Sequence, residues 1–341
     1  MTPLKEQTKE WYSQGAGLLF FLSVSFHEDL TMADEEQRRR EEFLIEKYPF
    51  RRNAFLLINK MVELMSQAPG DVTALVDEIL HSIFFLGKIH NPPFSPESIL
   101  NDDQMLNELE DLFPRPFDLC SSQLPMRSPF SCVLDMVIHL TGRENEFEII
   151  DGLRALISEL DLSEDLVSST ICVSHRTDIN GPVKYYGVSM SAPGRLPRKI
   201  MIAASCIGTW DRYVAGAVMT YFPSKKKDFD GTIQLPKRVR CQAFNLRKKE
   251  EKPPCGSCGN LFGLTPCENK EWVYGNCAEV ESLSNLFKYV DDVKVRARPA
   301  SRMYSDGVML LLERHVKKEL TNWLNHREFT WSNTFYTPQC L

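Results

Sequence analysis

The hydrophobic pattern of the chain changes period near residue 165, and this change limits the folds that the chain can adopt. Before it, apolar residues recur every three or four positions, as on the buried face of a helix. After it, short β-rich runs alternate with helical segments, which is typical of a domain layered from strands and helices. At 341 residues the chain is long enough for two domains. We therefore predict an N-terminal all-helical domain over residues 1–165 and an α/β layered domain over residues 166–341.

The first half has the sequence character of a small helical bundle. Apolar residues at helical spacing predict helices over residues 54–65 and from Asp71 to the sequence Asn91-Pro92-Pro93. The charged segment 34–47 has an apolar end and is assigned to a helix as well. Glu146–Leu160 is the last predicted helix, and the sequence up to this point contains no strand pattern or sustained heptad. This half carries no recognisable catalytic spacing.

The second half begins with a predicted β-hairpin. Two β-rich runs, residues 168–175 and 183–189, flank Asn180-Gly181, and an Asn-Gly pair in that position is a strong hairpin signal. Further predictions are a mainly helical buried segment over 199–222, a strand over 239–246, an amphipathic helix over 276–290, a short strand over 293–297, and a last helix capped by Ser305 or Asp306.

The two predicted domains carry opposite net charges. Residues 166–341 contain 26 basic and 16 acidic side chains, a net charge of +10, whereas residues 1–165 have a net charge of −16. A basic domain can attract a polyanion, so we expect a nucleotide or a nucleic acid as its ligand. The helical half is the candidate surface for protein partners. The alternatives are a solvated basic surface, or docking of the basic half onto the acidic half.

The cysteine content and the length of the apolar runs indicate in which cellular compartment the protein is expected. The ten cysteines are too few for a disulfide scaffold. The apolar run Gly17–Phe26 is only ten residues long, and a bilayer needs about 20. The residues before it are not typical of a cleaved signal peptide. We expect no membrane partner and a reducing compartment, cytoplasmic or nuclear, in which clustered cysteines bind metal or do chemistry more often than they form disulfides.

Four of the ten cysteines, Cys255, Cys258, Cys267 and Cys277, fall within 23 residues. The two-residue gap between Cys255 and Cys258 lets one turn present two sulfurs to the same ion, and zinc takes thiolates at about 2.3 Å. Cys277 follows Asn276, a good N-cap, so we expect its thiol in the first turn of a helix, where the dipole favours a thiolate. Asn276 and Glu279 also have the spacing of a capping box, in which the glutamate bonds back to the cap.

Two short motifs in this segment resemble those of the zinc-dependent cytidine/adenosine deaminase superfamily. Pro254-Cys255-Gly256-Ser257-Cys258 is similar to the PCxxC motif of that family, and Cys277-Ala278-Glu279 is similar to its HxE motif with cysteine in place of histidine. The resemblance covers about 25 residues of the chain, and the two motifs occur in the reverse of the family's order. The same site could assemble after a permutation or by convergence, because geometry rather than order makes a site.

The resemblance implies a catalytic zinc site. Cys255, Cys258 and Cys277 would hold Zn²⁺ with a fourth position open to water, and Glu279 would be the general acid/base without being a ligand. The implied activity is hydrolytic removal of an amino group from the base of a nucleotide or a nucleic acid. The implied fold of the second half is a deaminase-like α/β layered domain.

Two alternatives remain open from the sequence. If Cys267 also binds the ion, the site is a closed four-cysteine zinc site that only stabilises the fold, and the chain is a non-catalytic interaction or regulatory protein. Without a metal, Cys277 could be a nucleophile, which would need His175, His315 or His326 as its base.

Overall fold

The computed structural model describes residues 49–160, 162, 164–267, 269–299, 301 and 304–340. The helix predicted over 34–47 and the apolar run Gly17–Phe26 lie outside these residues. No helix in the described ranges has the length and apolar character needed to cross a bilayer.

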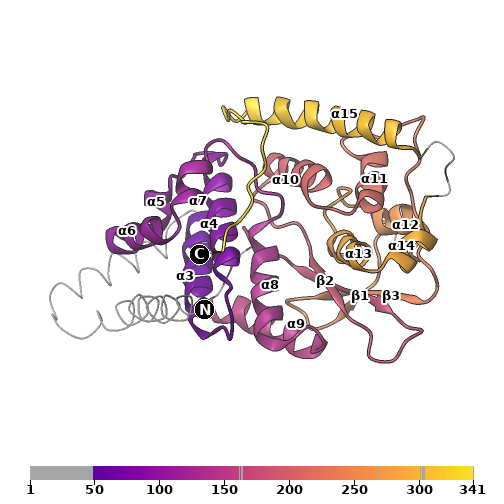
Figure 1. Ribbon diagram of the computed structural model, residues 1–341, viewed down its shortest axis with the longest axis horizontal. Coiled ribbons are helices and arrows are strands. Elements are labelled where there is room, and N and C mark those ends of the chain that lie inside the picture. The colour runs from indigo at the N-terminus through magenta and orange to yellow at the C-terminus, as the bar shows by residue number, and fades with distance from the viewer. Residues whose placement is uncertain are drawn as a thin grey trace, which may run out of the picture.

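The described part of the first half consists of helices (Figure 1). They are α3 (Pro49–Gln67), α4 (Thr73–Lys88), α5 (Pro96–Leu100), α6 (Asp103–Leu112), α7 (Pro114–Leu119), α8 (Pro129–Thr141) and α9 (Glu146–Glu159). Helix α4 is almost entirely buried because it packs against α3, α7 and α8. As the apolar spacing predicts, no strand lies before Thr170 in the residues that the structure describes.

The second half contains one antiparallel sheet with the strand order β2-β1-β3-β4. Its strands are β1 (Thr170–Arg176), β2 (Tyr185–Val188), β3 (Val239–Asn245) and β4 (Glu251–Lys252). The predicted strand over 239–246 is thus confirmed, and β1 and β2 pair as the hairpin prediction requires. The pairing ends at Ser174 and Tyr185, however, well before the Asn180-Gly181 turn. The backbone N–H of Thr177 donates to the carbonyl of Arg238 at 2.7 Å, so the chain leaving β1 stays beside the β3 side of the sheet.

The second half has six further helices in the described residues: α10 (Arg195–Gly208), α11 (Arg212–Tyr221), α12 (Gly256–Phe262), α13 (Ala278–Tyr289), α14 (Asp291–Ala297) and α15 (Asp306–Asn325). The segment predicted as mainly a buried helix over 199–222 is two helices, because Asp211 caps the second one by accepting from the N–H of Tyr213. The strand considered for Ile200–Ala204 is not formed, since these residues lie in α10. Ser305 caps α15, as predicted, by accepting from the N–H of Val308.

The short strand predicted over 293–297 is wrong, since these residues form α14. Only Val293 and Ala297 of this helix are buried, and they lie four residues apart on one face. Asp291 and Asp292 occupy its first turn, where negative charge is favoured by the helix dipole. The chain is therefore a mixed α+β protein, with many helices and a small antiparallel sheet.

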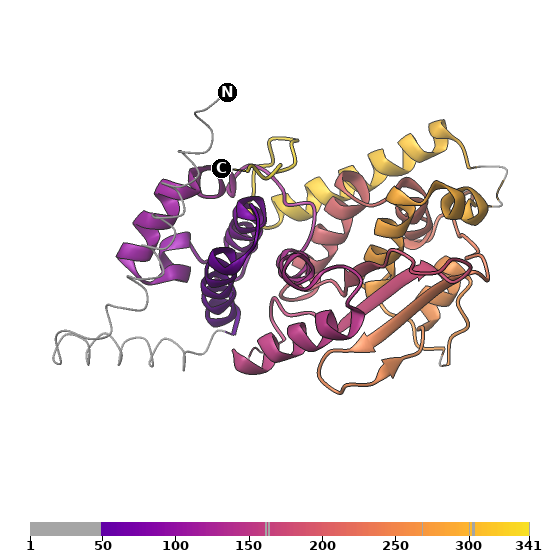
Figure 2. The ribbon, with the colours of Figure 1, turned by 60° about the horizontal axis from the view of Figure 1, so that its bottom comes forward.

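Helix α13 packs on one face of the sheet (Figure 2), and small residues bring the two together. A Cβ on Gly187 of β2 would lie 2.8 Å from the carbonyl oxygen of Ala278 and closer still to the N–H of Ser282. The hydroxyl of Ser282 donates to Ser174 Oγ of β1 at 2.7 Å, and also contacts the carbonyl of Tyr185. This close approach fixes the position of α13, and with it the position of Cys277 at the N-terminus of the helix.

The acidic and basic halves are packed against each other. One continuous cluster of buried apolar side chains includes residues from both, such as Ile138 and Val188. Glu146 of α9 forms ion pairs with Lys184 at 3.1 Å and Arg240 at 2.9 Å, so the charges of the halves meet at this contact. After α15 the chain returns to the helical half (Figure 1), where Phe335 forms a parallel bridge with Leu124.

Candidate metal centre

Cys255, Cys258 and Cys277 come together at the N-termini of two helices. Cys255 is the N-cap residue of α12, Cys258 lies in its first turn, and Cys277 is the N-cap residue of α13. The three Sγ atoms all lie within 4.8 Å of one another, and the Cys255 and Cys277 sulfurs are 3.5 Å apart. Around a tetrahedral ion with bonds of about 2.3 Å, two sulfurs lie about 3.8 Å apart. The group can therefore hold a metal ion.

The turn that carries Cys255 and Cys258 is held by the segment that follows it. The N–H of Gly256 donates to the carbonyl of Lys270 at 2.9 Å. The hydroxyl of Ser257 donates to the carbonyl of Trp272 at 2.7 Å and accepts from the N–H of Trp272 at 2.9 Å. Because residues 269–276 run along this turn, they bring Cys277 back to a pair of cysteines about 20 residues earlier in the chain.

The predicted capping box at the start of α13 is wrong. Cys277, not Asn276, is the N-cap residue, and its side chain makes no capping hydrogen bond. The carbonyl of Asn276 instead accepts from the N–H of Met190 at 2.9 Å, which ties this residue to the chain that leaves β2. The Cys277 sulfur is consequently at the N-terminus of the helix, and the Glu279 carboxyl group bonds to its own backbone N–H in the first turn rather than back to Asn276.

The three thiols have unequal acidities. Hydrogen bonds from Cys258 and Cys277 lower the pKa of Cys255 to about 2. The same bonds to Cys255, together with burial, raise the pKa of Cys258 and the pKa of Cys277. Cys258 is fully buried, whereas the other two residues are partly exposed. The three sulfurs thus form one hydrogen-bonded set in which the pKa of Cys255 is lowered, which favours the thiolate form that binds a cation.

The Glu279 carboxyl group lies beside these sulfurs without belonging to the group of three. It is 5% exposed, and a hydrogen bond links it to Cys258. Burial raises the pKa of Glu279, whereas hydrogen bonding and the charge of Lys252 act in the opposite direction. The position next to the cluster, outside the set of possible ligands, is that of a group that can exchange protons with a molecule at the centre.

Other residues considered from the sequence lie apart from the cluster. Cys267 is exposed, and among the described residues it is not one of the side chains whose ligand atoms meet at the centre. His175 has its Nδ1 2.8 Å from the carbonyl of Arg176 and its Nε2 3.4 Å from Arg240, which places it on the β3 side of the sheet. The arrangement therefore brings together three of the four clustered cysteines.

A second pair of thiols, which sequence reasoning missed, lies next to the centre. Cys172 of β1 and Cys241 of β3 have their sulfurs 3.6 Å apart, and both pack against Ala278 of α13. The alternation of side chains places both on the same face of the sheet. The alternation of side chains along each strand could be read from the sequence. The register that makes the two thiols neighbours could not.

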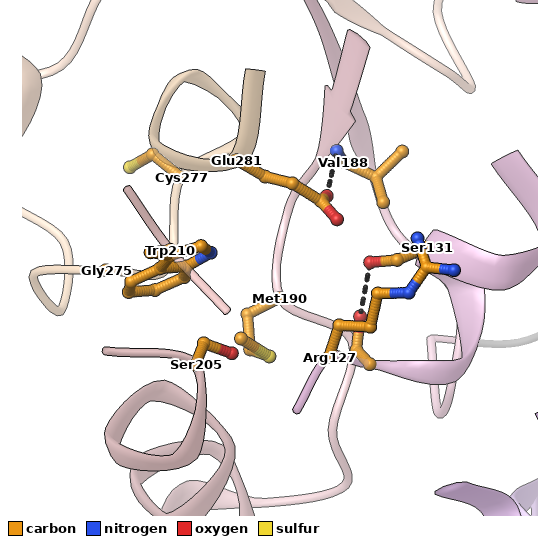
Figure 3. A pocket seen from close by; sticks show the side chains of 10 residues that line it. Arg127, Ser131, Val188, Met190, Ser205, Trp210, Gly275, Cys277 and Glu281 are labelled. Carbon is orange, nitrogen blue, oxygen red and sulfur yellow. Dashed lines mark hydrogen bonds between the residues drawn. The ribbon is translucent and has the colours of Figure 1, made fainter. Parts of the chain in front are cut away.

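Cys277 also lines a small cavity (Figure 3). Glu281 points into it and accepts from the N–H of Val188 at 2.7 Å. Arg127 also lines it, and this guanidinium pairs with Glu78 at 2.6 Å and with Asp135. Burial raises the pKa of Glu281. Cys277, Glu281 and Arg127 thus line one cavity, and Arg127 connects it to carboxylates of the helical half.

Comparison of the chain with protein-family models, with curated proteins and with solved structures finds no match.

Proposed function

We propose that this chain is a zinc-dependent, deaminase-like hydrolase that acts on the base of a nucleotide or a nucleic acid. The observation that carries the proposal is the convergence of Cys255, Cys258 and Cys277, with the Glu279 carboxyl group beside them. Three cysteine sulfurs and an adjacent carboxyl group outside the ligand set match the donor set implied by the PCxxC and Cys-Ala-Glu motifs. The proposal also assigns to the second half a deaminase-like layering of helices on the sheet.

In this proposal the chain's own residues have distinct roles. Cys255, Cys258 and Cys277 hold the ion, and a bound zinc ion would supply a water molecule of lowered pKa. Glu279 accepts a proton from the attacking water and returns it to the departing amino group. In the balanced reaction, water adds to the amino-bearing ring carbon, the carbon–nitrogen bond breaks, and ammonia leaves with a carbonyl in its place.

The ligand set supports an open site rather than a closed one. A structural four-cysteine site would need Cys267, which is exposed and lies outside the group of three in the described chain. Three protein ligands leave one position of a tetrahedral ion for water.

Metal analysis tests the site directly. The purified wild-type protein is expected to contain one equivalent of zinc, and Cys277→Ser is expected to lose it. Cys267→Ser is the matched control and is expected to keep the metal. A metal-free native protein would contradict the proposed site, and loss of zinc from Cys267→Ser would favour the structural alternative.

Ammonia release tests the catalytic role. Cytidine, adenosine, their nucleotides and single-stranded oligonucleotides form the substrate panel. Glu279→Gln is expected to abolish release from any active substrate while zinc content and folding stay unchanged. Glu251→Gln, an exposed carboxylate on β4, is the control and is expected to stay active. A fully active Glu279→Gln protein would remove the assigned role.

A further inference from the structure

A surface of aromatic rings and lysines adjoins the metal centre. We name it the aromatic–lysine surface, and its members are Tyr221, Lys225, Lys270, Trp272 and Tyr274. The rings of Tyr221 and Tyr274 are stacked, with centroids 4.3 Å apart and planes 5° from parallel. Lys225 Nζ lies 5.6 Å from the centroid of Tyr221, and Lys270 Nζ lies 4.3 Å from that of Trp272. Two of the three aromatic rings on this surface thus have a lysine over them.

The exposure of Trp272 is the unusual feature of this surface. Its side chain is 50% exposed, and the neighbouring Val273 is 40% exposed. Burial of a large aromatic side chain is worth a few kcal/mol, so the exposed ring gives up stabilisation that the fold could have used. An exposed ring with a lysine over it offers a flat face and a positive charge together.

Hydrogen bonds from Ser257 and Asn260 join the surface to the helix that carries Cys258. Ser257 lies between Cys255 and Cys258 and makes two hydrogen bonds to the backbone of Trp272. Asn260 of the same helix donates to the hydroxyl of Tyr274 at 2.8 Å. A ligand that stacks on Trp272 is consequently held at a fixed position relative to the cysteines.

We infer that the aromatic–lysine surface binds single-stranded nucleic acid, so that the substrate of the centre is a base within a strand. This inference rests on the proposed function. Stacked bases and phosphates would find rings and lysines along this surface, and such stacking is tolerant of sequence. A free nucleotide would instead need a pocket that encloses most of its surface, whereas Trp272 lies on the open surface.

Two carboxylates lie near the same surface. Glu271 accepts a hydrogen bond from Asn260 Nδ2 at 2.9 Å. Burial raises the pKa of Tyr221, and the negative charges of Asp230 and Glu271 raise it further. They reduce the net positive charge, so we assign the binding mainly to stacking and expect only a moderate dependence on salt.

Fluorescence anisotropy of the zinc-loaded full-length protein tests the inference. The probes are labelled single-stranded RNA and single-stranded DNA of about 12 nucleotides, a length within the range that such surfaces cover. Trp272→Ala is expected to weaken binding of at least one probe about tenfold, and Trp272→Phe, which keeps a ring, is expected to retain most of it. The two probes distinguish RNA from DNA as the source of the strand.

A matched control exists on another part of the chain. Lys317 Nζ lies 5.1 Å from the ring of Trp331, the same type of pair as Lys270 and Trp272. Lys270→Gln is expected to weaken binding about threefold, since each phosphate contact contributes part of the affinity. Lys317→Gln is expected to leave binding unchanged. Equal losses from both substitutions would overturn the assignment to this surface.

The two proposals can fail separately. Glu279→Gln is expected to bind the strand normally, because that residue lies outside the surface. Unchanged binding by Trp272→Ala, or competition by a free mononucleotide as effective as that by the strand, would overturn the inference and leave the metal centre and ammonia release unaffected. Absence of zinc would instead remove the proposed function, and strand binding would then be judged from the Trp272 variants alone.

Discussion

Gly187 of β2 lies directly against the backbone of Ser282 in α13. A side chain at position 187 would have to displace the helix, because the atoms it would meet are backbone atoms. We predict that Gly187→Ala lowers the free energy of unfolding by about 3 kcal/mol, the upper part of the usual range for overpacking. The shift of α13 should also move Cys277, so the affinity for zinc should fall. Urea denaturation and a competitive chelator titration measure the two effects.

Gly307→Ala is the control for this prediction. Gly307 lies in the first turn of α15, and a Cβ there would meet no heavy atom within 4 Å. Alanine is a better helix former than glycine, so stability should stay the same or rise slightly. If Gly187→Ala proved as stable as Gly307→Ala, the close packing of α13 would not be what positions Cys277.

Local signals were sufficient to predict much of this chain. The periodicity of apolar residues predicts α4, α13 and α15, and the side chain of Ser305 caps α15 as expected. The spacing of Cys255 and Cys258 already predicts a turn that presents two sulfurs to one point. These features depend on residues within one or two helical turns of each other, which is the range over which sequence patterns are informative.

The predictions that were wrong or missing depend on contacts between segments that are distant in the sequence. Asn276 does not cap α13 because its carbonyl pairs with Met190, 86 positions earlier in the chain. The β-branched pattern of Val293 and Val295 suggests a strand, but the segment buries only the face that carries Val293 and Ala297, as a helix does. The neighbouring sulfurs of Cys172 and Cys241 depend on strand register, which the sequence alone does not define.

We predict that Cys172 and Cys241 do not hold the metal. They pack in a small apolar cluster with Ala243 and Ala278, and they do not belong to the group of three at the centre. Cys172→Ala and Cys241→Ser should each keep one equivalent of zinc, with a loss of about 1 kcal/mol of stability for the buried Cys172. Metal analysis beside Cys277→Ser checks this. Zinc content that falls in either variant would mean that the second thiol pair takes part in binding.

The ion pairs of Glu146 should make the contact between the halves sensitive to pH. Burial alone would raise the pKa of Glu146, but its hydrogen bonds with Arg240 and Lys184 outweigh burial and lower it. A carboxyl group with a lowered pKa in the folded protein contributes stability above its ordinary value of 4.5, and that contribution disappears as pH falls through the folded-state pKa. Glu146→Gln should therefore lower the free energy of unfolding by about 1 kcal/mol at neutral pH and hardly change it at acidic pH.

Urea denaturation at a series of pH values measures this difference. Glu148→Gln is the control, because Glu148 is exposed on the same helix. Its effect should be small at every pH, limited to the loss of a favourable charge in the first turn of α9. A stability difference for Glu146→Gln that stayed constant from neutral to acidic pH would show that charge does not carry this contact.

The C-terminal segment is held on the helical half by Tyr336. Its ring stacks on His81 with centroids 3.8 Å apart, and its hydroxyl donates to Asp77 at 2.6 Å. Burial raises the pKa of Asp77, and the hydrogen bond from Tyr336 partly offsets that effect.

Tyr336→Phe keeps the ring but removes a buried donor, so it should lower the free energy of unfolding by about 2 kcal/mol. Faster amide exchange at Tyr336, whose N–H donates to Leu124, should accompany the loss. Tyr289→Phe, at a ring that is 73% exposed, should change neither measurement. Equal stability of the two variants would mean that the segment is held by apolar packing alone.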